Sequence, residues 1–378
     1  MMYDGDPIGK KGEGMKAWDY EHGLLQVSAS LRRSYGLAAE YQGDPAVDAW
    51  LQAHSFRCVI ALLIDGMGSR ILAQHLPAGS FFRSHMAEEV STVYPTTTAA
   101  ATTAFQTGRS PAENGWIGWN QYFREMDDQI VLFRNVGEYS GISYPGFSWR
   151  TLPIITLQQE LAAHGIGADE AWPGWADHHP CRTYQDLLDC LDQLCRGKET
   201  RYLYGYWDRF DSMMHRLGPS SMAVQQELQR LDDATAAFAA ALPGDVGLLV
   251  IADHGQIDAR HYALDQDREL SDCLRMPPSL EARTASFFLK PERKAEFTEL
   301  FQARLGRSFE LLSHEEAVAS GIFGPGAPHP RFEEFLGDEI AFATDRIQID
   351  FRKGYDLCGN HAGMMDEERL IPVILSPR

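Results

Sequence analysis

The sequence contains no stretch long and apolar enough to span a membrane, and no cysteine pattern typical of a disulfide framework. Its apolar runs fall short of the roughly 18 residues that a spanning helix needs, and the N-terminus lacks the apolar segment of a secretory signal. The six cysteines form no C-x-x-C pair, which also argues against a thiolate zinc site: Cys58, Cys181, Cys190, Cys195, Cys273 and Cys358. We expect a cytoplasmic protein with reduced thiols and no membrane partner.

Positive charge is also scarce. The chain has 34 lysines and arginines against 53 aspartates and glutamates, a formal net charge of −19. Such a surface repels a polyanion, so a nucleic-acid polymer is not an expected partner. Part of the acidic excess is explained as a solubilising surface, and the sharper alternative is that some carboxylates hold divalent cations.

Three short apolar runs predict buried strands, and each run ends on an aspartate. The runs are 58–65 (CVIALLID), 201–211 (RYLYGYWDRFD) and 246–253 (VGLLVIAD). Helical periodicity lies between them, at 98–107, 157–163 and 222–242. This alternation predicts an α/β fold with a mostly parallel central sheet covered by helices on both faces. Ligands of such sheets bind beyond the carboxyl ends of the strands, where these aspartates fall.

The chain divides into a short leader and one large domain. Residues 1–14, rich in glycine and charge, are expected to form a flexible leader, and residues 15–378 a single catalytic domain. Two stretches interrupt the α/β pattern and read as insertions at the functional edge of the sheet. The first, at about 116–195, is an aromatic cap; the second, at about 261–342, is a small α/β subdomain with its own strand and helix.

A run of threonines at the start of an expected helix is the first group that could carry chemistry. The segment YPTTTAAATTAFQTG places Thr96, Thr97 and Thr98 where free backbone N–H groups and the helix dipole stabilise an alkoxide or a phosphoryl oxygen. An ordinary N-cap threonine is the simpler interpretation of this segment alone.

Aspartates and histidines supply the remaining groups. Asp65 follows the first strand in LLIDGMG, and the later motifs are D-x-x-x-H (Asp211, His215), the adjacent pair Asp253 and His254, and His361 in a Gly-Asn loop. Each motif has a simpler explanation in isolation, such as turn chemistry or a surface hydrogen bond. Together, three aspartates, three histidines and a hydroxyl match the ligand needs of two zinc-like ions.

The order of these motifs resembles that of the alkaline phosphatase superfamily, and within it the type I phosphodiesterase and nucleotide pyrophosphatase group, from about residue 55 to the C-terminus. The resemblance implies an alkaline-phosphatase-like fold with inserted cap segments and two divalent metal ions, zinc or else manganese. One ion is then held by Asp65, Thr98, Asp253 and His254, and the other by Asp211, His215 and His361. The family's nucleophile lies nine residues before the threonine of a Thr-Gly pair. That spacing indicates Thr98, with Thr96 and Thr97 as near alternatives.

The implied activity is hydrolysis of phosphodiester or pyrophosphate bonds through a phosphothreonine intermediate. The partner is a small phosphorylated substrate, with nucleotides as candidates. A phosphomonoesterase is the closest alternative. A phosphonate hydrolase is less favoured because members that cleave carbon–phosphorus bonds use lysines in the first insertion, and this chain has none between Lys16 and Lys198. No sulfatase signature surrounds the threonines, and a non-catalytic binding protein is disfavoured by the complete ligand set.

Substrate-binding residues are less clear from the resemblance. The pyrophosphatase group has an asparagine some 21 residues after the nucleophile, where this chain has Trp119 followed by Asn120. Arg109, directly after Thr-Gly, is either an oxygen clamp or a cation at a helix C-terminus. The aromatic residues of the first insertion either stack a flat leaving group or build a small core: Trp116, Trp119, Tyr122, Phe123, Phe147 and Trp149. His178 and His179 are not needed for a two-ion site.

Overall fold

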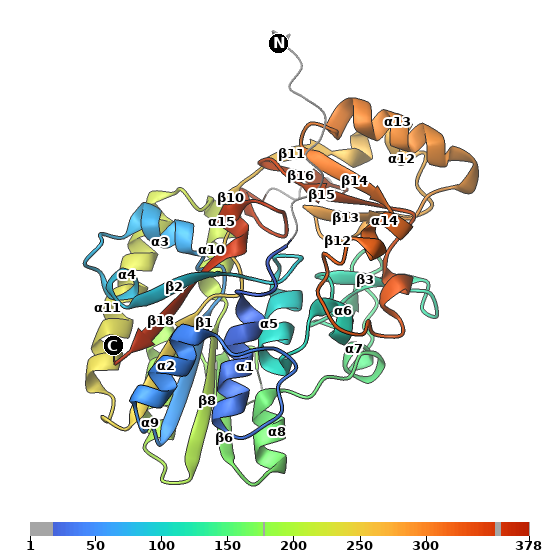
Figure 1. The fold of residues 1–378 in the computed structure, drawn as a ribbon. Helices are drawn as coiled ribbons and strands as arrows, with labels where there is room; N and C mark the ends of the chain where they lie inside the picture. The colour runs from blue at the N-terminus through green and yellow to red at the C-terminus, as the bar shows by residue number, and fades with distance from the viewer. Residues whose placement is uncertain (1–17, 177, 352–356, 378) are drawn as a thin grey trace.

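A computed structural model describes residues 18–176, 178–351 and 357–377; the leader expected at 1–14 lies outside the described residues. Its central sheet has seven strands, in the order β2 (Met86–Ser91), β18 (Leu370–Ser376), β9 (Val246–Ile251), β1 (Cys58–Ile64), β8 (Thr200–Trp207), β6 (Gly167–Pro173) and β7 (Pro180–Cys181). From β9 to β7 all pairings are parallel, and β18 pairs antiparallel with both neighbours. This arrangement confirms the predicted fold class (Figure 1).

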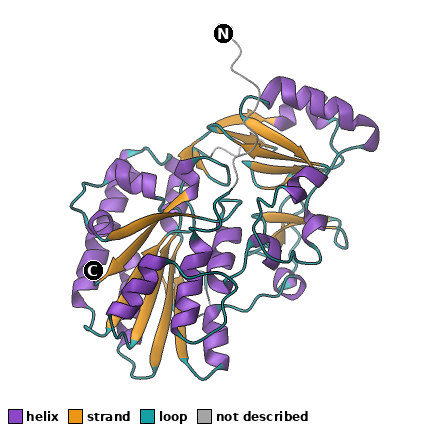
Figure 2. Ribbon diagram, viewed as in Figure 1, coloured by secondary structure: helices purple, strands orange, loops and turns teal. Residues whose placement is uncertain are grey.

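Helices cover both faces of this sheet (Figure 2). On β8, Tyr204 contacts Phe105 of α5 (Thr98–Thr107), whereas the next residue, Gly205, lies against Leu191 of α9 (Tyr184–Cys195). Successive strand residues point to opposite faces, so these two helices lie on opposite sides of the sheet. The remaining helices of the core are α1 (Leu24–Ser34), α2 (Pro45–Ala53), α3 (Ser69–His75), α4 (Phe81–Ser84), α8 (Leu157–Ala163), α10 (Arg209–Leu217), α11 (Met222–Ala241) and α15 (Asp366–Arg369).

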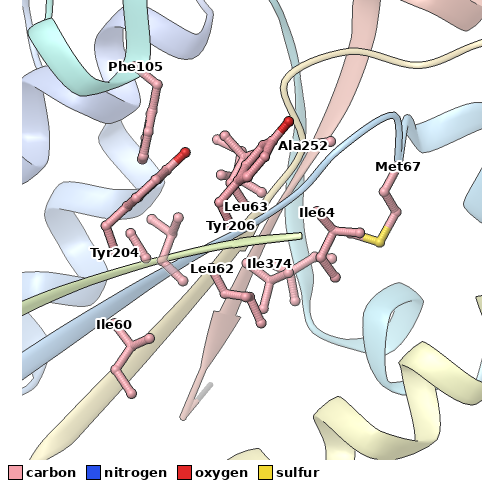
Figure 3. Close-up of a cluster of buried hydrophobic side chains, with 14 of the residues drawn as sticks. Ile60, Leu62, Leu63, Ile64, Met67, Phe105, Tyr204, Tyr206, Ala252 and Ile374 are labelled. Carbon is pink, nitrogen blue, oxygen red and sulfur yellow. The ribbon is translucent and has the colours of Figure 1, made fainter. Parts of the chain in front are cut away.

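The core between these layers is built from the apolar runs that the sequence showed. All seven residues of β1 and all six of β9 are buried. Figure 3 shows part of this core, with Ile60, Leu62 and Ile64 of β1 beside Tyr204 and Tyr206 of β8. A strand buried on both faces has no polar side to alternate with, which is why these segments read as continuous apolar runs.

The two insertions form a single second sheet, which the sequence did not predict. Its order is β14 (Phe309–Ser313), β15 (Glu339–Ala343), β13 (Thr284–Phe287), β12 (Ser279–Leu280), β3 (Asn120–Phe123), β4 (Asp128–Val131) and β5 (Val136–Gly137). The pairing of Leu280 with Asn120 joins the second insertion to the first. We call this unit the cap sheet. Its helices are α6 (Pro111–Asn114), α7 (Phe147–Thr151), α12 (Arg268–Ser271), α13 (Lys294–Leu305) and α14 (His314–Ala319), with 3-10 turns at Leu264–Gln266, Pro291–Arg293 and Phe332–Phe335.

The described residues form two further small strand pairs. They are β10 (Ile257–Asp258) with β17 (Gly359–Asn360), and β11 (Arg260–Ala263) with β16 (Ile347–Asp350).

Two predicted boundaries differ from the structure. The first insertion does not extend to about 195, because α8, β6 and α9 belong to the central sheet and its helices; only the part up to α7 contributes to the cap. The strand expected at 201–211 ends at Trp207, and α10 begins at Arg209. The run of aromatic and apolar residues is interrupted by the charged residues Asp208 and Arg209, and the change from strand to helix falls at this interruption.

Most aromatic residues of the first insertion build the core of the cap, the simpler of the two interpretations. Trp116 and Phe123 are fully buried, and Phe147 packs against the same cluster. Trp149 lies beside Trp116, with ring centroids 4.7 Å apart, although 41% of Trp149 is exposed. Among these aromatic residues only Trp119 lines the cavity described below.

A buried ion pair fastens the cap sheet to the core. Arg283, in the turn between β12 and β13, donates to both carboxylate oxygens of Glu368 at 2.7 and 2.8 Å, and both side chains are fully buried. Glu368 in turn accepts from the backbone N–H of Gly363 at 2.7 Å. The loop from β17 to α15 is therefore held by the cap.

Removing one partner of this pair is expected to be costly, because it leaves the other charge buried without compensation. We predict that Arg283→Ala lowers the free energy of unfolding by about 3–5 kcal/mol, measured by urea denaturation. Arg230→Ala is the matched control, since Arg230 pairs with Glu227 on an exposed face of α11 and should cost less than about 1 kcal/mol. Equal effects of the two variants would contradict the role given to Arg283.

Candidate metal centre and nucleophile

Three aspartates converge at one edge of the central sheet. Asp65 directly follows β1, Asp253 lies two residues after β9, and Asp211 lies in the first turn of α10, just after β8. These strands are adjacent and parallel, so their carboxyl ends meet. All three side chains are buried. Gly66 follows Asp65 with a left-handed φ of 74°, a conformation that favours glycine. Glycine also allows the close approach of Asp211, because a Cβ at this position would lie 3.1 Å from an oxygen of Asp211.

The three predicted histidines lie in the same place with their rings fixed. Each Nδ1 faces a backbone carbonyl: His215 that of Gly359 at 2.8 Å, His254 that of Gly255 at 3.0 Å, and His361 that of Thr96 at 2.9 Å. A carbonyl oxygen only accepts hydrogen bonds, so each Nδ1 carries a hydrogen, and in the neutral ring Nε2 keeps its lone pair. That lone pair is the group with which a neutral histidine binds a metal.

The six side chains form two trios. In the first, Nε2 of His254 lies 3.4 Å from Asp65 Oδ1 and 3.5 Å from Asp253 Oδ2. We name this group of Asp65, Asp253 and His254 the first trio. The stacked rings of His254 and His361, with centroids 3.8 Å apart, bring the two trios side by side.

The second trio consists of Asp211, His215 and His361. Nε2 of His215 lies 3.2 Å from Asp211 Oδ2, one helical turn apart on α10, and Nε2 of His361 lies 3.9 Å from Asp211 Oδ1. Within each trio one ligand atom per residue falls inside a 4.8 Å span, as a single ion requires.

Thr98 is the hydroxyl that faces the first trio. Its Oγ1 lies 3.1 Å from His254 Nε2 and 3.4 Å from both oxygens of Asp65. It is the first residue of α5, where backbone N–H groups have no partner within the helix. The neighbouring threonines are engaged elsewhere: Thr96 donates to the Gly363 carbonyl and Thr97 to the carboxylate of Glu281.

The donor set fits divalent cations. Oδ2 of Asp253 is buried, and no described residue hydrogen-bonds to it. The pKa of Asp65 is raised well above its usual range, mainly by burial and to a smaller extent by the nearby carboxylates of Asp253 and Asp211. The pKa of His361 is lowered well below its usual range, mainly by burial and to a smaller extent by the neighbouring His254, and this keeps its ring neutral. Buried carboxylates with neutral imidazoles are the ligands that zinc and similar ions take, and each trio could hold one ion.

Three residues outside the predicted ligand set orient these carboxylates. The Tyr206 hydroxyl donates to Asp65 Oδ2, Gln256 Nε2 donates to Asp211 Oδ1 at 2.6 Å, and the Gly66 N–H donates to Asp253 Oδ1 at 3.0 Å. Such contacts fix the direction of a ligand's lone pairs and are part of most metal sites. Gln256 could have been predicted from the sequence, because it lies two residues after the Asp-His pair. Tyr206 could not, because only the pairing of β1 with β8 brings it to Asp65.

A cavity of about 700 Å³ opens onto this centre and is walled by the cap. Thr98, His215 and His361 line it on one side, and Trp119 and Asn120 of the cap line it as well. Asn120 Oδ1 accepts from the Leu280 N–H at 3.2 Å, so the amide nitrogen of Asn120 is the end left for a ligand. The structure thus brings both residues into the cavity that Thr98 lines.

Arg109 does not reach this cavity, and its prediction as an oxygen clamp is wrong. Its guanidinium lies 3.6 Å from Glu40 and 3.8 Å from Glu113, and it lines a separate hollow. The reason is the length of α5, whose ten residues place its C-terminus about 15 Å from Thr98. The alternative, a cation beyond the helix C-terminus, agrees with its position after the left-handed cap Gly108.

His178 and His179 form a third Asp-His group with Asp169 of β6, outside the cavity lining. Asp169 lies 2.7 Å from His178 and 3.4 Å from His179. This group lies closer to the surface than the two trios, and all three side chains are at least partly exposed.

Glu281 is a further cavity residue that sequence reasoning missed. Its carboxylate accepts from the Thr97 hydroxyl at 2.5 Å and from the Trp119 N–H at 2.7 Å, which ties the start of α5 to the cap. Burial raises the pKa of Glu281 to about 7, against the effect of these two hydrogen bonds. No motif marks the residue, because its two partners lie far away in the sequence.

The raised pKa predicts a pH-dependent difference between wild type and Glu281→Gln. The pKa of Glu281 is 4.5 in the unfolded chain and about 7 in the folded protein, so between these pH values the folded protein binds a proton that the unfolded chain does not. The stabilising contribution of this proton is complete below pH 4.5 and is lost as the pH rises through 7. Relative to wild type, the variant should therefore gain about 1–2 kcal/mol between pH 5 and pH 8, less than the full linkage value because the side chain is partly exposed. Urea denaturation of metal-free protein at both pH values measures this, and a difference that stays constant contradicts it.

Comparison with known proteins agrees with this geometry. Murine ectonucleotide pyrophosphatase/phosphodiesterase 5 has a similar structure, with a TM-score of 0.64 at 18% identity, covering 84% of this chain and 87% of that one. An inactive variant of that protein in complex with AMP gives 0.65 at 18% identity, with the same coverage. Phosphonoacetate hydrolase from Sinorhizobium meliloti, in complex with phosphonoformate, gives 0.62 at 15% identity, covering 85% of this chain and 90% of that one. At these identities the likeness shows a shared fold.

The sequence comparison is more specific. A search of curated protein sequences found no match. Residues 59–303, well over half of the 378-residue chain, match the family model for type I phosphodiesterase / nucleotide pyrophosphatase. The chain therefore belongs to the type I phosphodiesterase / nucleotide pyrophosphatase family, as its motifs indicated.

Proposed function

We propose that the protein hydrolyses phosphodiester or pyrophosphate bonds of small phosphorylated substrates, using Thr98 as nucleophile beside two divalent metal ions. The observation that carries this proposal is the position of Thr98 Oγ1, 3.1 Å from His254 and 3.4 Å from Asp65 at the open start of a helix. Asp65, Thr98, Asp253 and His254 would hold one ion, and Asp211, His215 and His361 the other. Zinc is the expected metal and manganese the alternative.

Bound divalent ions supply Lewis-acid stabilisation of charge on the phosphoryl oxygens and lower the pKa of a hydroxyl or water. Thr98 Oγ1 gives up its proton and attacks phosphorus in line; its bond to phosphorus forms while the bond to the leaving oxygen breaks, the departing oxygen takes up a proton, and phosphothreonine results. Water then attacks phosphorus and the bond to Thr98 Oγ1 breaks, which restores the hydroxyl. Two inversions give net retention at phosphorus. The N-terminal N–H groups of α5 and the Asn120 amide can donate to the phosphoryl oxygens.

Nucleotides are the first substrates to test. AMP is bound in the structure of the inactive mouse protein of similar fold, and the cavity here offers Trp119 as an aromatic wall. The acidic surface does not exclude such anions, because two dications would set the local field at the centre. It does disfavour nucleic-acid polymers. A search of the described helices found none long and apolar enough to cross a membrane. The cytoplasmic location stays a prediction.

Two other activities deserve comparison on the same preparation. A phosphomonoesterase would prefer p-nitrophenyl phosphate to bis-p-nitrophenyl phosphate. A phosphonate hydrolase is raised by the similar fold of phosphonoacetate hydrolase, although the described cap contains only Lys290 and Lys294, neither of which lines the cavity. A non-catalytic binding protein would hydrolyse none of these substrates.

Replacing Thr98 tests the nucleophile directly. We predict that Thr98→Ala lowers kcat by at least about 1,000-fold on bis-p-nitrophenyl phosphate and leaves the metal content nearly intact, because both trios remain. Thr97→Ala is the matched control, since its hydroxyl faces Glu281, and it should keep activity within about tenfold. Full activity of Thr98→Ala, or loss of activity only in Thr97→Ala, would reject the assignment.

Removal of metal tests the two-ion centre. We predict that a chelator abolishes turnover, that zinc or manganese restores it, and that His361→Ala binds one ion per chain where wild type binds two, because only the second trio loses a ligand. Elemental analysis after gel filtration measures the ratio. Equal metal content in wild type and variant would contradict the assignment of His361.

A further inference from the structure

Arg134 is a cavity residue with no role in the centre described above. It lies in the turn between β4 and β5 of the cap sheet, and its guanidinium carbon lies 5.5 Å from the centroid of the Trp119 ring. Phe133 contacts the same ring edge-on, with centroids 6.4 Å apart. The turn is anchored by buried Asn135, whose N–H donates to the Val131 carbonyl at 2.8 Å. Arg134 is thus presented from a fixed turn.

The guanidinium of Arg134 has no acidic partner among the described residues. No carboxylate of residues 18–176, 178–351 or 357–377 forms an ion pair with it, and its N–H groups donate to none of these residues. By contrast, the guanidinium of Arg109 faces both Glu40 and Glu113. Contact with the face of an aromatic ring leaves the N–H donors of a guanidinium available to a ligand.

Arg134 is also the sole arginine or lysine among the described residues that line this cavity. The other charged side chains there include the acidic Glu138, Glu281 and Asp350, which would repel an anion. An anionic substrate therefore meets two attractive places in the cavity: the metal centre beside Thr98, and Arg134. A planar guanidinium binds phosphate or carboxylate through two parallel hydrogen bonds.

We propose that Arg134, held over Trp119, binds a second anionic group of the substrate, so that the preferred substrates carry one next to the scissile bond, as in a nucleoside pyrophosphate. This inference rests on the proposed function, since it assigns the metal centre to the phosphorus under attack. The shared chemistry of the second group is an oxyanion. A phosphoryl group supplies it in a pyrophosphate, and a carboxylate supplies it in a phosphonocarboxylate such as phosphonoacetate.

Substrate pairs separate this role from a general effect on the site. For Arg134→Gln we expect kcat/KM on ADP-ribose to fall by about 10- to 100-fold, the loss typical of one charged hydrogen-bonded contact, and on bis-p-nitrophenyl phosphate by less than about threefold. Arg134→Lys should recover part of the loss because it keeps the charge. Arg109→Gln is the matched control, and should change neither substrate. Equal losses on both substrates, or none on either, would overturn the proposal.

Assays with phosphonoacetate as a further substrate identify which kind of oxyanion Arg134 binds. Turnover of phosphonoacetate by wild type, lost in Arg134→Gln, would assign the second group as a carboxylate. Turnover of ADP-ribose without phosphonoacetate would assign it as a phosphoryl group. Both results support an oxyanion at Arg134.

A binding measurement keeps the proposal testable without turnover. In zinc-loaded Thr98→Ala protein we expect ADP to bind at least about tenfold more tightly than AMP by calorimetry, and the difference to disappear when Arg134→Gln is added. If wild type hydrolyses no substrate but this difference holds, the proposed function fails and the anion site stands. If hydrolysis is observed and the difference is absent, the anion site fails and the proposed function stands.

Discussion

The mutual repulsion of three buried carboxylates is the constraint on which the rest of this structure depends. Asp65, Asp211 and Asp253 lie at the carboxyl ends of three neighbouring strands, and each is less than a tenth exposed. Burying unpaired charge is expensive, so a fold that collects three such groups needs protons or cations to offset them. The raised pKa of Asp65 means that a proton offsets the charge of this carboxyl when no cation is bound. The histidines, whose Nε2 atoms are left for a ligand, indicate that metal ions can offset the charge instead.

The surrounding contacts hold this unfavourable arrangement in place. Backbone carbonyls orient all three histidines: distant ones for His215 and His361, and that of the next residue for His254. Tyr206 and Gln256 orient two of the carboxylates. The loop that carries His361 is also tied to the cap by the buried pair of Arg283 and Glu368. The candidate metal centre and the cavity wall formed by the cap are therefore connected, and a shift of the cap would disturb the loop that carries His361.

Sequence reasoning succeeded where a local pattern has one structural outcome. The buried strands of the core, the helix around residues 98–107 and the D-x-x-x-H turn follow from apolar runs and helical spacing, and chain order brought the aspartates to one edge of a parallel sheet. It failed where the outcome depends on distant partners. The pairing of Leu280 with Asn120, the contact of Glu281 with Thr97, and the position of Arg134 over the Trp119 ring have no local signature. Arg109 was wrongly assigned to the site because it is near Thr98 in the sequence, although the length of α5 separates the two residues in space.

Anomalous diffraction from a zinc-loaded crystal tests the central claim most directly. The account predicts two zinc peaks, one within Asp65, Asp253 and His254 and the other within Asp211, His215 and His361, with Thr98 Oγ1 coordinated to the first. A single peak shared by the six side chains, or zinc bound elsewhere with both trios empty, would contradict it.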